Sequence, residues 1–207
     1  MEGKTESYHQ KSPRWRVYQG LEIVMNTETK KNKITLFPGG FQKVKNYGYP
    51  GLDIWTGDDF PDDLKYPDFF IGHSAGASFV LRYAAKRTSQ YIFVNPLVKR
   101  KGIFFLFSRW IKYAFQEGLP TEKFIPLKYW PGALIKVINL SRIDFLSAAK
   151  DIPKENITVI RGKNDNFFCD EEAARIIQEN GIRLIEVAAG HDWNENIEEA
   201  VARIIRG

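Results

Sequence analysis

The sequence predicts an α/β protein in which helices cover both faces of a mostly parallel sheet of about seven or eight strands. Three observations predict this class. Short apolar runs alternate with helix-like stretches along the chain. Runs of about four to six apolar residues, bounded by glycine or proline, are typical of strands buried on both faces. At roughly 150 residues per domain, the 207 residues are expected to form one domain over positions 1–207.

Eight segments carry the strand pattern. The first two flank Gly20 and are expected to form an antiparallel pair ahead of the parallel strands. Several of the others end at glycine or proline residues, which interrupt regular structure. The expected strands cover residues 15–18, 21–25, 34–37, 52–55, 69–72, 91–94, 157–160 and 184–187.

Helices are expected between the later strands. One covers residues 75–87, directly after a strand. Asp170 is a suitable N-cap for a second helix, which runs to about Asn180 and is stopped by Gly181. A third begins near Asn194 and carries an apolar face to the C-terminus.

The spacing of the strands is uneven. Only 14 residues separate Phe37 from Leu52 and 13 separate Trp55 from Phe69, which leaves little room for complete crossover helices. The stretch 97–150 has 54 residues, no strand pattern and much helical pattern. Because it is too long for a single loop, we expect a helical cap insertion with helices near 103–116 and 131–150.

Composition excludes several classes of protein. A single cysteine, Cys169, rules out an internal disulfide and a cysteine-based metal framework, and no metal or cofactor is expected. The longest strongly apolar run, 103–107, is far shorter than the roughly 20 residues of a membrane span. The polar stretch 1–14 lacks the apolar core of a secretory signal, so a cytoplasmic location is expected. The acidic stretch 58–63 lacks calcium-loop spacing and is expected to be a solvated loop.

One motif carries chemistry. The segment Gly72-His73-Ser74-Ala75-Gly76 fits G-x-S-x-G and lies between an expected strand and an expected helix. On such a tight turn the serine hydroxyl is exposed at the edge of the sheet, while the next backbone N–H groups open a helix and can hold a developing oxyanion. The motif predicts Ser74 as a nucleophile.

A serine nucleophile needs a base, and the chain has three histidines. His9 lies in the polar N-terminal stretch. His73 adjoins Ser74 on a sharp turn, where packing or hydrogen bonding beside the serine is the expected role. His191 follows the last expected strand on a glycine-containing loop and is therefore the predicted base.

The base needs an acid to orient it. Asp165 lies on a loop after the expected strand 157–160 and precedes His191 by 26 residues, enough for one helix and one strand. Asp144, in the helical insertion, is the alternative; Asp170 is better used as a helix cap, and Asp192 is too close to His191 in sequence. We predict Asp165 from its loop placement.

A second oxyanion donor is expected beside Ala75, the residue after the serine. The loop at 37–41 follows an expected strand, and its two glycines allow the backbone to approach a substrate closely. Gly40 is the preferred donor and Phe41 the second choice.

These four motifs, in this order, resemble those of the α/β-hydrolase superfamily. The match runs from about residue 34 to the C-terminus and implies Ser74 as nucleophile, His191 as base, Asp165 as acid, and Gly40 and Ala75 as oxyanion donors. Cap insertions at 97–150 are common in the family. The chain departs from the family in having Pro38-Gly39 where His-Gly is frequent, and in its short connections on either side of residues 52–55.

The resemblance implies a serine hydrolase, most of all a carboxylesterase-like enzyme that cleaves an ester or thioester of a small acyl substrate. The alternative is a catalytically degenerate fold that acts as a binding or membrane-surface protein. The net charge of +5 by itself indicates no nucleic-acid partner, and nothing indicates an oligomeric state.

The insertion begins with a basic and aromatic stretch at 99–113. It could lie on anionic lipid as an amphipathic helix, or cover an acyl pocket with its lysines in solvent. We favour the second interpretation, because consecutive Phe-Phe-Leu-Phe residues spread around a helix instead of forming one stripe.

Overall fold

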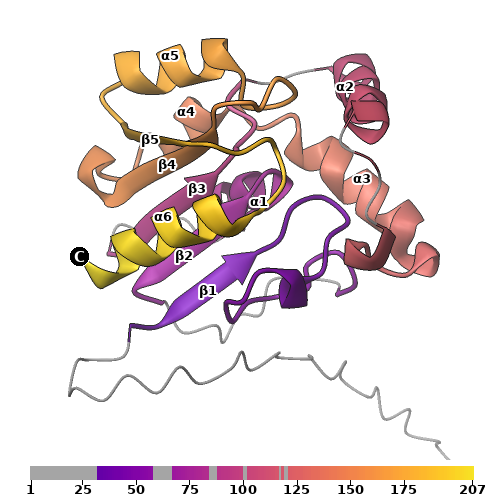
Figure 1. The fold of residues 1–207 in the computed structure, drawn as a ribbon, viewed down its shortest axis with the longest axis horizontal. Coiled ribbons are helices and arrows are strands. Elements are labelled where there is room, and N and C mark those ends of the chain that lie inside the picture. Colours follow the sequence, from indigo (N-terminus) through magenta and orange to yellow (C-terminus); the bar gives the residue numbers. More distant parts are fainter. Residues whose placement is uncertain (1–31, 58–66, 84–87, 100–101, 117, 119–120) are drawn as a thin grey trace, which may run out of the picture.

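The computed structural model describes residues 32–57, 67–83, 88–99, 102–116, 118 and 121–207 (Figure 1). Its centre is one sheet in which every pair of neighbouring strands is parallel. The strands follow the order of the chain: β1 (Ile34–Phe37), β2 (Phe69–His73), β3 (Gln90–Val94), β4 (Ile157–Gly162) and β5 (Arg183–Val187). The parallel α/β class is confirmed, with five strands among the described residues.

The expected strand at 52–55 is wrong. Gly51 forms a single parallel bridge to Leu36, and Leu52 then donates its N–H to the Leu36 carbonyl at 3.0 Å. The chain turns there because Asp53 bonds elsewhere: its carbonyl accepts from Thr56, and its side chain accepts from the Val44 N–H at 2.7 Å. The expected strands at 15–18 and 21–25, His9 and the acidic stretch 58–63 lie outside the described residues.

Alternate residues of each strand face opposite sides of the sheet, as the two-residue period of a strand requires. Phe70 and Phe93 belong to a core shared with helices α1, α3, α4 and α5, whereas Ile71 and Ile92 belong to a core shared with α6. Both faces of the sheet are therefore covered, which explains why the strands read as continuous apolar runs.

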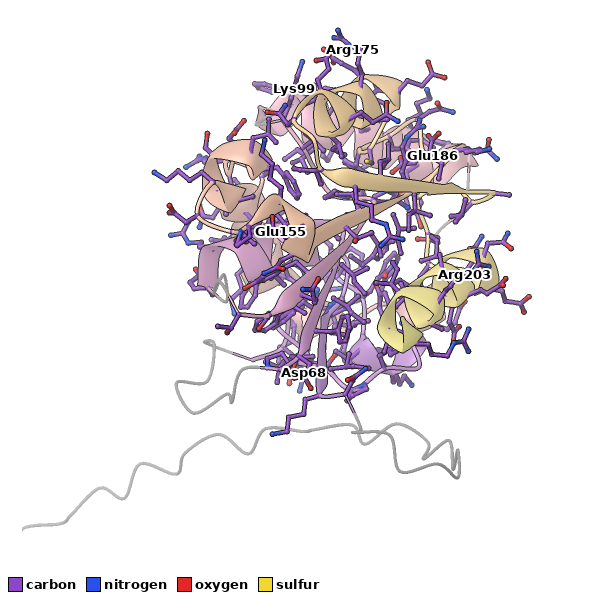
Figure 2. All side chains as sticks on the ribbon, turned by 90° about the vertical axis from the view of Figure 1, so that its left-hand side faces the viewer. Asp68, Lys99, Glu155, Arg175, Glu186 and Arg203 are labelled. Atoms are coloured by element: carbon purple, nitrogen blue, oxygen red, sulfur yellow. The ribbon has the colours of Figure 1, made fainter. Side chains whose placement is uncertain are left out.

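Three helices follow the expected pattern. They are α1 (Ala75–Tyr83), α5 (Glu171–Glu179) and α6 (Glu195–Arg206). Asp170 and Asn194 are N-caps whose side chains accept from the N–H groups of Ala173 and Ile197. The outer faces of α5 and α6 are charged, and Arg175 and Arg203 project into solvent from them (Figure 2).

The insertion between β3 and β4 is helical, as expected, but it is more broken than the sequence pattern predicts. Its elements are α2 (Ile103–Gln116), η2 (Thr121–Lys123), η3 (Leu127–Tyr129), α3 (Trp130–Leu140) and α4 (Phe145–Ala149). The expected single helix over 131–150 is wrong, because Asp144 adopts an extended backbone and caps α4 by accepting from the Ser147 N–H at 2.9 Å. Two further single turns are η1 (Val44–Asn46) and η4 (Lys154–Asn156).

Figure 1 shows α2 and α3 on the side of the sheet toward which the arrow of β1 points. Since the strands are parallel, this is the edge where all of them end. Within the described part of the chain, no helix has the length and apolarity that crossing a bilayer demands.

Candidate active site

The loops that follow four strands meet at the carboxyl edge of the sheet. Ser74 comes directly after β2, Asp165 after β4 and His191 after β5, and Gly40 lies on the loop after β1. Side chains or backbone of Ser74, His191 and Gly40 line one cavity. The structure thus brings together residues as far apart in the sequence as Gly40 and His191.

Ser74 occupies a strained turn. Its φ is 51°, a left-handed value that is uncommon for a residue other than glycine. Its N–H donates to the Val94 carbonyl of β3 at 2.8 Å, and its carbonyl accepts from the Ala77 N–H at 3.0 Å. These backbone hydrogen bonds keep Ser74 in its strained conformation, so that the hydroxyl lies above the edge of the sheet.

Gly76 lets helix α1 approach β1. A Cβ at this position would lie 2.3 Å from the Phe37 carbonyl oxygen and 2.7 Å from that of Pro38. Both obstacles are backbone atoms, so neither can move without shifting the strand or its loop. The glycine is therefore required by close packing.

We expect Gly76→Ala to lower the free energy of unfolding by about 1–3 kcal/mol, the usual range for overpacking. The matched control is Gly132→Ala in α3, where a Cβ would meet nothing within 4 Å. That change is expected to stay within about 1 kcal/mol of wild type, because alanine is the better helix former. Urea denaturation of the two variants checks this, and equal stability would refute the packing argument.

The side chains of Ser74, His191 and Asp165 form a continuous chain of hydrogen bonds, which we call the relay. Nε2 of His191 lies 3.0 Å from Oγ of Ser74, and Nδ1 lies 2.7 Å from Oδ2 of Asp165. Because the carboxylate can only accept, Nδ1 carries the ring proton. Nε2 is then the acceptor that faces the serine hydroxyl, which is the tautomer a general base requires.

Asp165 is held as a carboxylate. Its side chain is fully buried and accepts from the N–H groups of Phe167, Phe168 and Cys169 at 2.9–3.1 Å. Burial acts to raise the pKa of Asp165, but the charge and hydrogen bond of His191, together with the backbone N–H donors, outweigh it and lower the pKa to about 2. The acid is therefore ionised at neutral pH, and the three backbone N–H donors fix the orientation of its carboxylate.

His73 supports the loop that carries His191. It is buried, its Nε2 donates to the His191 carbonyl at 2.9 Å, and its Nδ1 lies 2.8 Å from the hydroxyl of Tyr47. Burial lowers the pKa of His73 to about 4, helped by the neighbouring His191, so the ring is neutral at pH 7. Hydrogen bonding beside the serine is the role that the sequence predicts for this histidine.

Asn95 and Tyr47 also hold the site, and sequence reasoning missed both. Asn95, buried with a φ of 45°, donates to the carbonyls of Gly190 and His191 at 3.0 and 2.8 Å and accepts from the Gly162 N–H at 2.8 Å. The Tyr47 hydroxyl accepts from the Gly39 N–H at 2.8 Å. The only signal for Asn95 is its place directly after β3, and Tyr47 carries no signal.

Gly40, Phe41 and Ala75, the residues predicted to supply oxyanion donors, all line the cavity beside Ser74. No described residue accepts a hydrogen bond from any of their backbone N–H groups. A Cβ built on Gly40 would lie 4.0 Å from that of Ala75, so the two predicted donors are neighbours. Phe41 has a φ of 62°, and its ring packs against those of Trp55 and Trp130. Backbone N–H groups placed in this way are the kind that can stabilise a negatively charged oxygen.

The alternative acids have other partners. Asp144 caps α4 and Asp170 caps α5. Asp192 lies 3.3 Å from Nε2 of Gln42 and 3.9 Å from the Lys123 ammonium. The structure therefore places Asp165 alone, of the four aspartates considered, at the histidine.

The cavity above Ser74 has a volume of about 90 Å³ and is mostly apolar. Its walls come from the insertion as well as from the sheet edge. Its apolar lining residues are Leu97, Leu106, Trp110, Tyr113, Phe124, Val137 and Phe168. A small acyl group fits the size and character of such a cavity better than a large polar one.

Cys169 is buried below the acid loop. Burial raises the pKa of its thiol well above the ordinary value, so the sulfur is a protonated thiol and not a nucleophilic thiolate. Among the residues that the structure places, no three histidine, cysteine or acidic side chains gather as metal ligands would.

Comparison with solved structures finds several proteins of similar architecture. A lipase-esterase related protein from Clostridium acetobutylicum ATCC 824 is 16% identical and matches 84% of this chain and 92% of its own, with a TM-score of 0.59. An α/β hydrolase enzyme from a Medee basin deep-sea metagenome library is 12% identical over 93% and 92%, with a TM-score of 0.58. The enol-lactonase from Burkholderia xenovorans LB400 is 14% identical over 93% and 94%, with a TM-score of 0.55. No protein-family model matches the sequence, and no curated protein does. At these identities the likenesses show a shared fold.

Proposed function

We propose that this chain, which has the α/β-hydrolase fold predicted by its motifs, is a serine hydrolase that cleaves a carboxylic ester through an acyl-enzyme. The observation that carries the proposal is the relay from Ser74 through His191 to the ionised Asp165. The candidate oxyanion donors Gly40, Phe41 and Ala75 line the same cavity. A nucleophile, a base, an orienting acid and oxyanion donors are the parts that acyl transfer needs.

In the first half of the reaction, Oγ of Ser74 attacks the carbonyl carbon of the ester while its proton passes to Nε2 of His191. The carbonyl oxygen becomes an oxyanion, which the N–H groups of Ala75 and Gly40 stabilise, with Phe41 as the second candidate. The imidazolium is stabilised by Asp165 and gives its proton to the leaving alcohol oxygen as the carbon–oxygen bond breaks. The product is an ester of Ser74 with the acyl group.

In the second half, water attacks the acyl carbon and gives a proton to Nε2 of His191. The same N–H groups hold the second oxyanion. His191 returns the proton to Oγ of Ser74 as the acid is released, so the free enzyme is restored. No step of this sequence uses a metal or an organic cofactor, and a thioester would react by the same route.

The 3.0 Å contact between His191 and Ser74 favours this activity over the alternative of a degenerate, non-catalytic fold. In a degenerate site, nothing would favour a His191 tautomer that faces the serine hydroxyl or an ionised Asp165. The apolar cavity lining favours an uncharged acyl group as the part of the substrate next to Ser74.

We expect the protein to hydrolyse p-nitrophenyl esters, with kcat/KM rising about fourfold for each of the first few methylenes added to acetate. The reason is that one buried methylene contributes about 0.8 kcal/mol. Initial rates over a series of acyl lengths measure this. A sharp preference for acetate would contradict the apolar acyl site. Absence of hydrolysis across the series, together with absence of labelling by a fluorophosphonate probe, would overturn the proposed function.

A further inference from the structure

Exposed apolar side chains are concentrated on the helical insertion. Among the described residues, eight large hydrophobic side chains are exposed, and seven of them lie between positions 104 and 135. We call these seven the apolar face: Phe104, Phe107, Ile111, Phe115, Leu127, Leu134 and Ile135. Phe104 and Phe115 are 89% and 87% exposed, so the described part of the chain leaves them almost uncovered.

Helix α2 is apolar on two sides. Its inner side contributes Leu106, Trp110 and Tyr113 to the cavity. Its outer side carries Phe104, Phe107, Ile111 and Phe115, whose spacing keeps them on one side of a helix. The Phe-Phe-Leu-Phe run does spread around the helix, as the sequence predicts, but its outward members continue into an exposed stripe. By contrast, the outer sides of α5 and α6 present charges (Figure 2).

The net positive charge of the protein comes from the same part of the chain. Residues 99–142 contain nine basic and two acidic residues, a formal charge of +7, whereas the remaining residues together carry −2. Lys112 and Lys128 are exposed and lie near the apolar face, each with its ammonium over an aromatic ring. Helices α2 and α3 both border the cavity, and Figure 1 shows them on the same side of the molecule.

We propose that the apolar face docks on a membrane surface that contains anionic lipid. Exposed phenylalanine, leucine and isoleucine surrounded by basic residues match the boundary between acyl chains and anionic headgroups. A second copy of the chain is a poorer occupant, because pairing two such faces would bring together two segments that each carry a formal charge of +7. The docking does not depend on Ser74 or on the proposed hydrolysis.

Sedimentation with lipid vesicles tests this on the full chain. We expect binding to vesicles of equal parts phosphatidylcholine and phosphatidylglycerol, weaker binding as salt screens the charges, and much weaker binding to phosphatidylcholine alone. Ser74→Ala is expected to bind as wild type does, so failure of the activity and failure of the docking are separate results. Absence of wild-type binding to the mixed vesicles would overturn the proposal.

Two sets of variants locate the contact. Phe104→Ser and Phe115→Ser are each expected to lower the partition coefficient about tenfold. Lys112→Glu with Lys128→Glu is expected to lower it at least twentyfold, at about fivefold for each lost positive charge. The matched charge control is Lys154→Glu with Arg183→Glu, exposed residues just before β4 and at the start of β5, at the opposite edge of the sheet. That pair is expected to bind within about twofold of wild type.

Tyr83→Ser is the matched apolar control, since Tyr83 is the one large hydrophobic residue, among those that the structure describes, that is exposed outside the insertion. Unchanged vesicle binding by the phenylalanine variants and by the paired lysine variant would overturn the proposal. Equal losses of binding in these variants and in the control variants would also overturn it. Sedimentation equilibrium without lipid gives a further check. A dimer that the phenylalanine variants dissociate, combined with no vesicle binding, would assign the face to a second copy instead.

Discussion

Ser74→Ala is expected to lower kcat for p-nitrophenyl ester hydrolysis by about a million-fold, the scale seen when a serine nucleophile is removed. The variant loses the atom that attacks the carbonyl, which lies 3.0 Å from Nε2 of His191. The strained turn is set by backbone bonds to Val94 and Ala77, which alanine keeps. The fold and its unfolding free energy should therefore change little.

Labelling by a fluorophosphonate probe gives an independent measurement, because it reports the reactive serine without a chosen substrate. Ser147→Ala is the matched control, since Ser147 is exposed on α4 and is not part of the cavity lining. We expect labelling of wild type and Ser147→Ala and none of Ser74→Ala. Equal labelling of all three would remove Ser74 from the reaction.

Asp165→Asn is expected to lower kcat by about ten-thousand-fold while KM changes little. The asparagine amide can donate toward Nδ1 of His191, which moves the ring proton to Nε2. Nε2 then faces Oγ of Ser74 as a donor and cannot take its proton. The buried imidazolium would also lack the charge that stabilises it.

Asp170→Asn is the matched control for the loss of an aspartate charge nearby. Asparagine is as good an N-cap as aspartate, so the bond to the Ala173 N–H and the helix should be kept. Its kcat is expected to stay within about twofold of wild type. A loss in Asp165→Asn of less than tenfold would show that the buried carboxylate does not set the tautomer of His191.

The strands could be predicted where both faces of the sheet are covered, because burial on two sides leaves a continuous apolar run such as Phe69–His73. The same signal misled at residues 52–55. Those residues are apolar because the core surrounds Leu52, Ile54 and Trp55. The chain nevertheless forms a turn there, and a single bridge between Gly51 and Leu36 stands where a strand was expected. Burial alone does not distinguish a packed turn from a strand.

The candidate site residues could be predicted because each stands on the loop that follows a strand and because the chain has only three histidines. The supporting residues could not be predicted in this way. Asn95 and Tyr47 act through backbone carbonyls and N–H groups of distant loops, and such contacts leave no local pattern. The two apolar sides of α2 also depend on tertiary structure, since periodicity does not say which side faces the cavity.

The helical insertion joins two strands that are neighbours in the sheet, with Tyr91 opposite Ile157. The entropy of closing such a loop grows only with the logarithm of its length, so doubling it costs about 0.6 kcal/mol. Ser74, Asp165, His191 and Gly40 all lie outside the insertion. A different set of helices that packs on the same core could replace it at little cost in loop-closure entropy. The walls of the cavity and the outer surface can therefore diverge while the reacting atoms keep their positions.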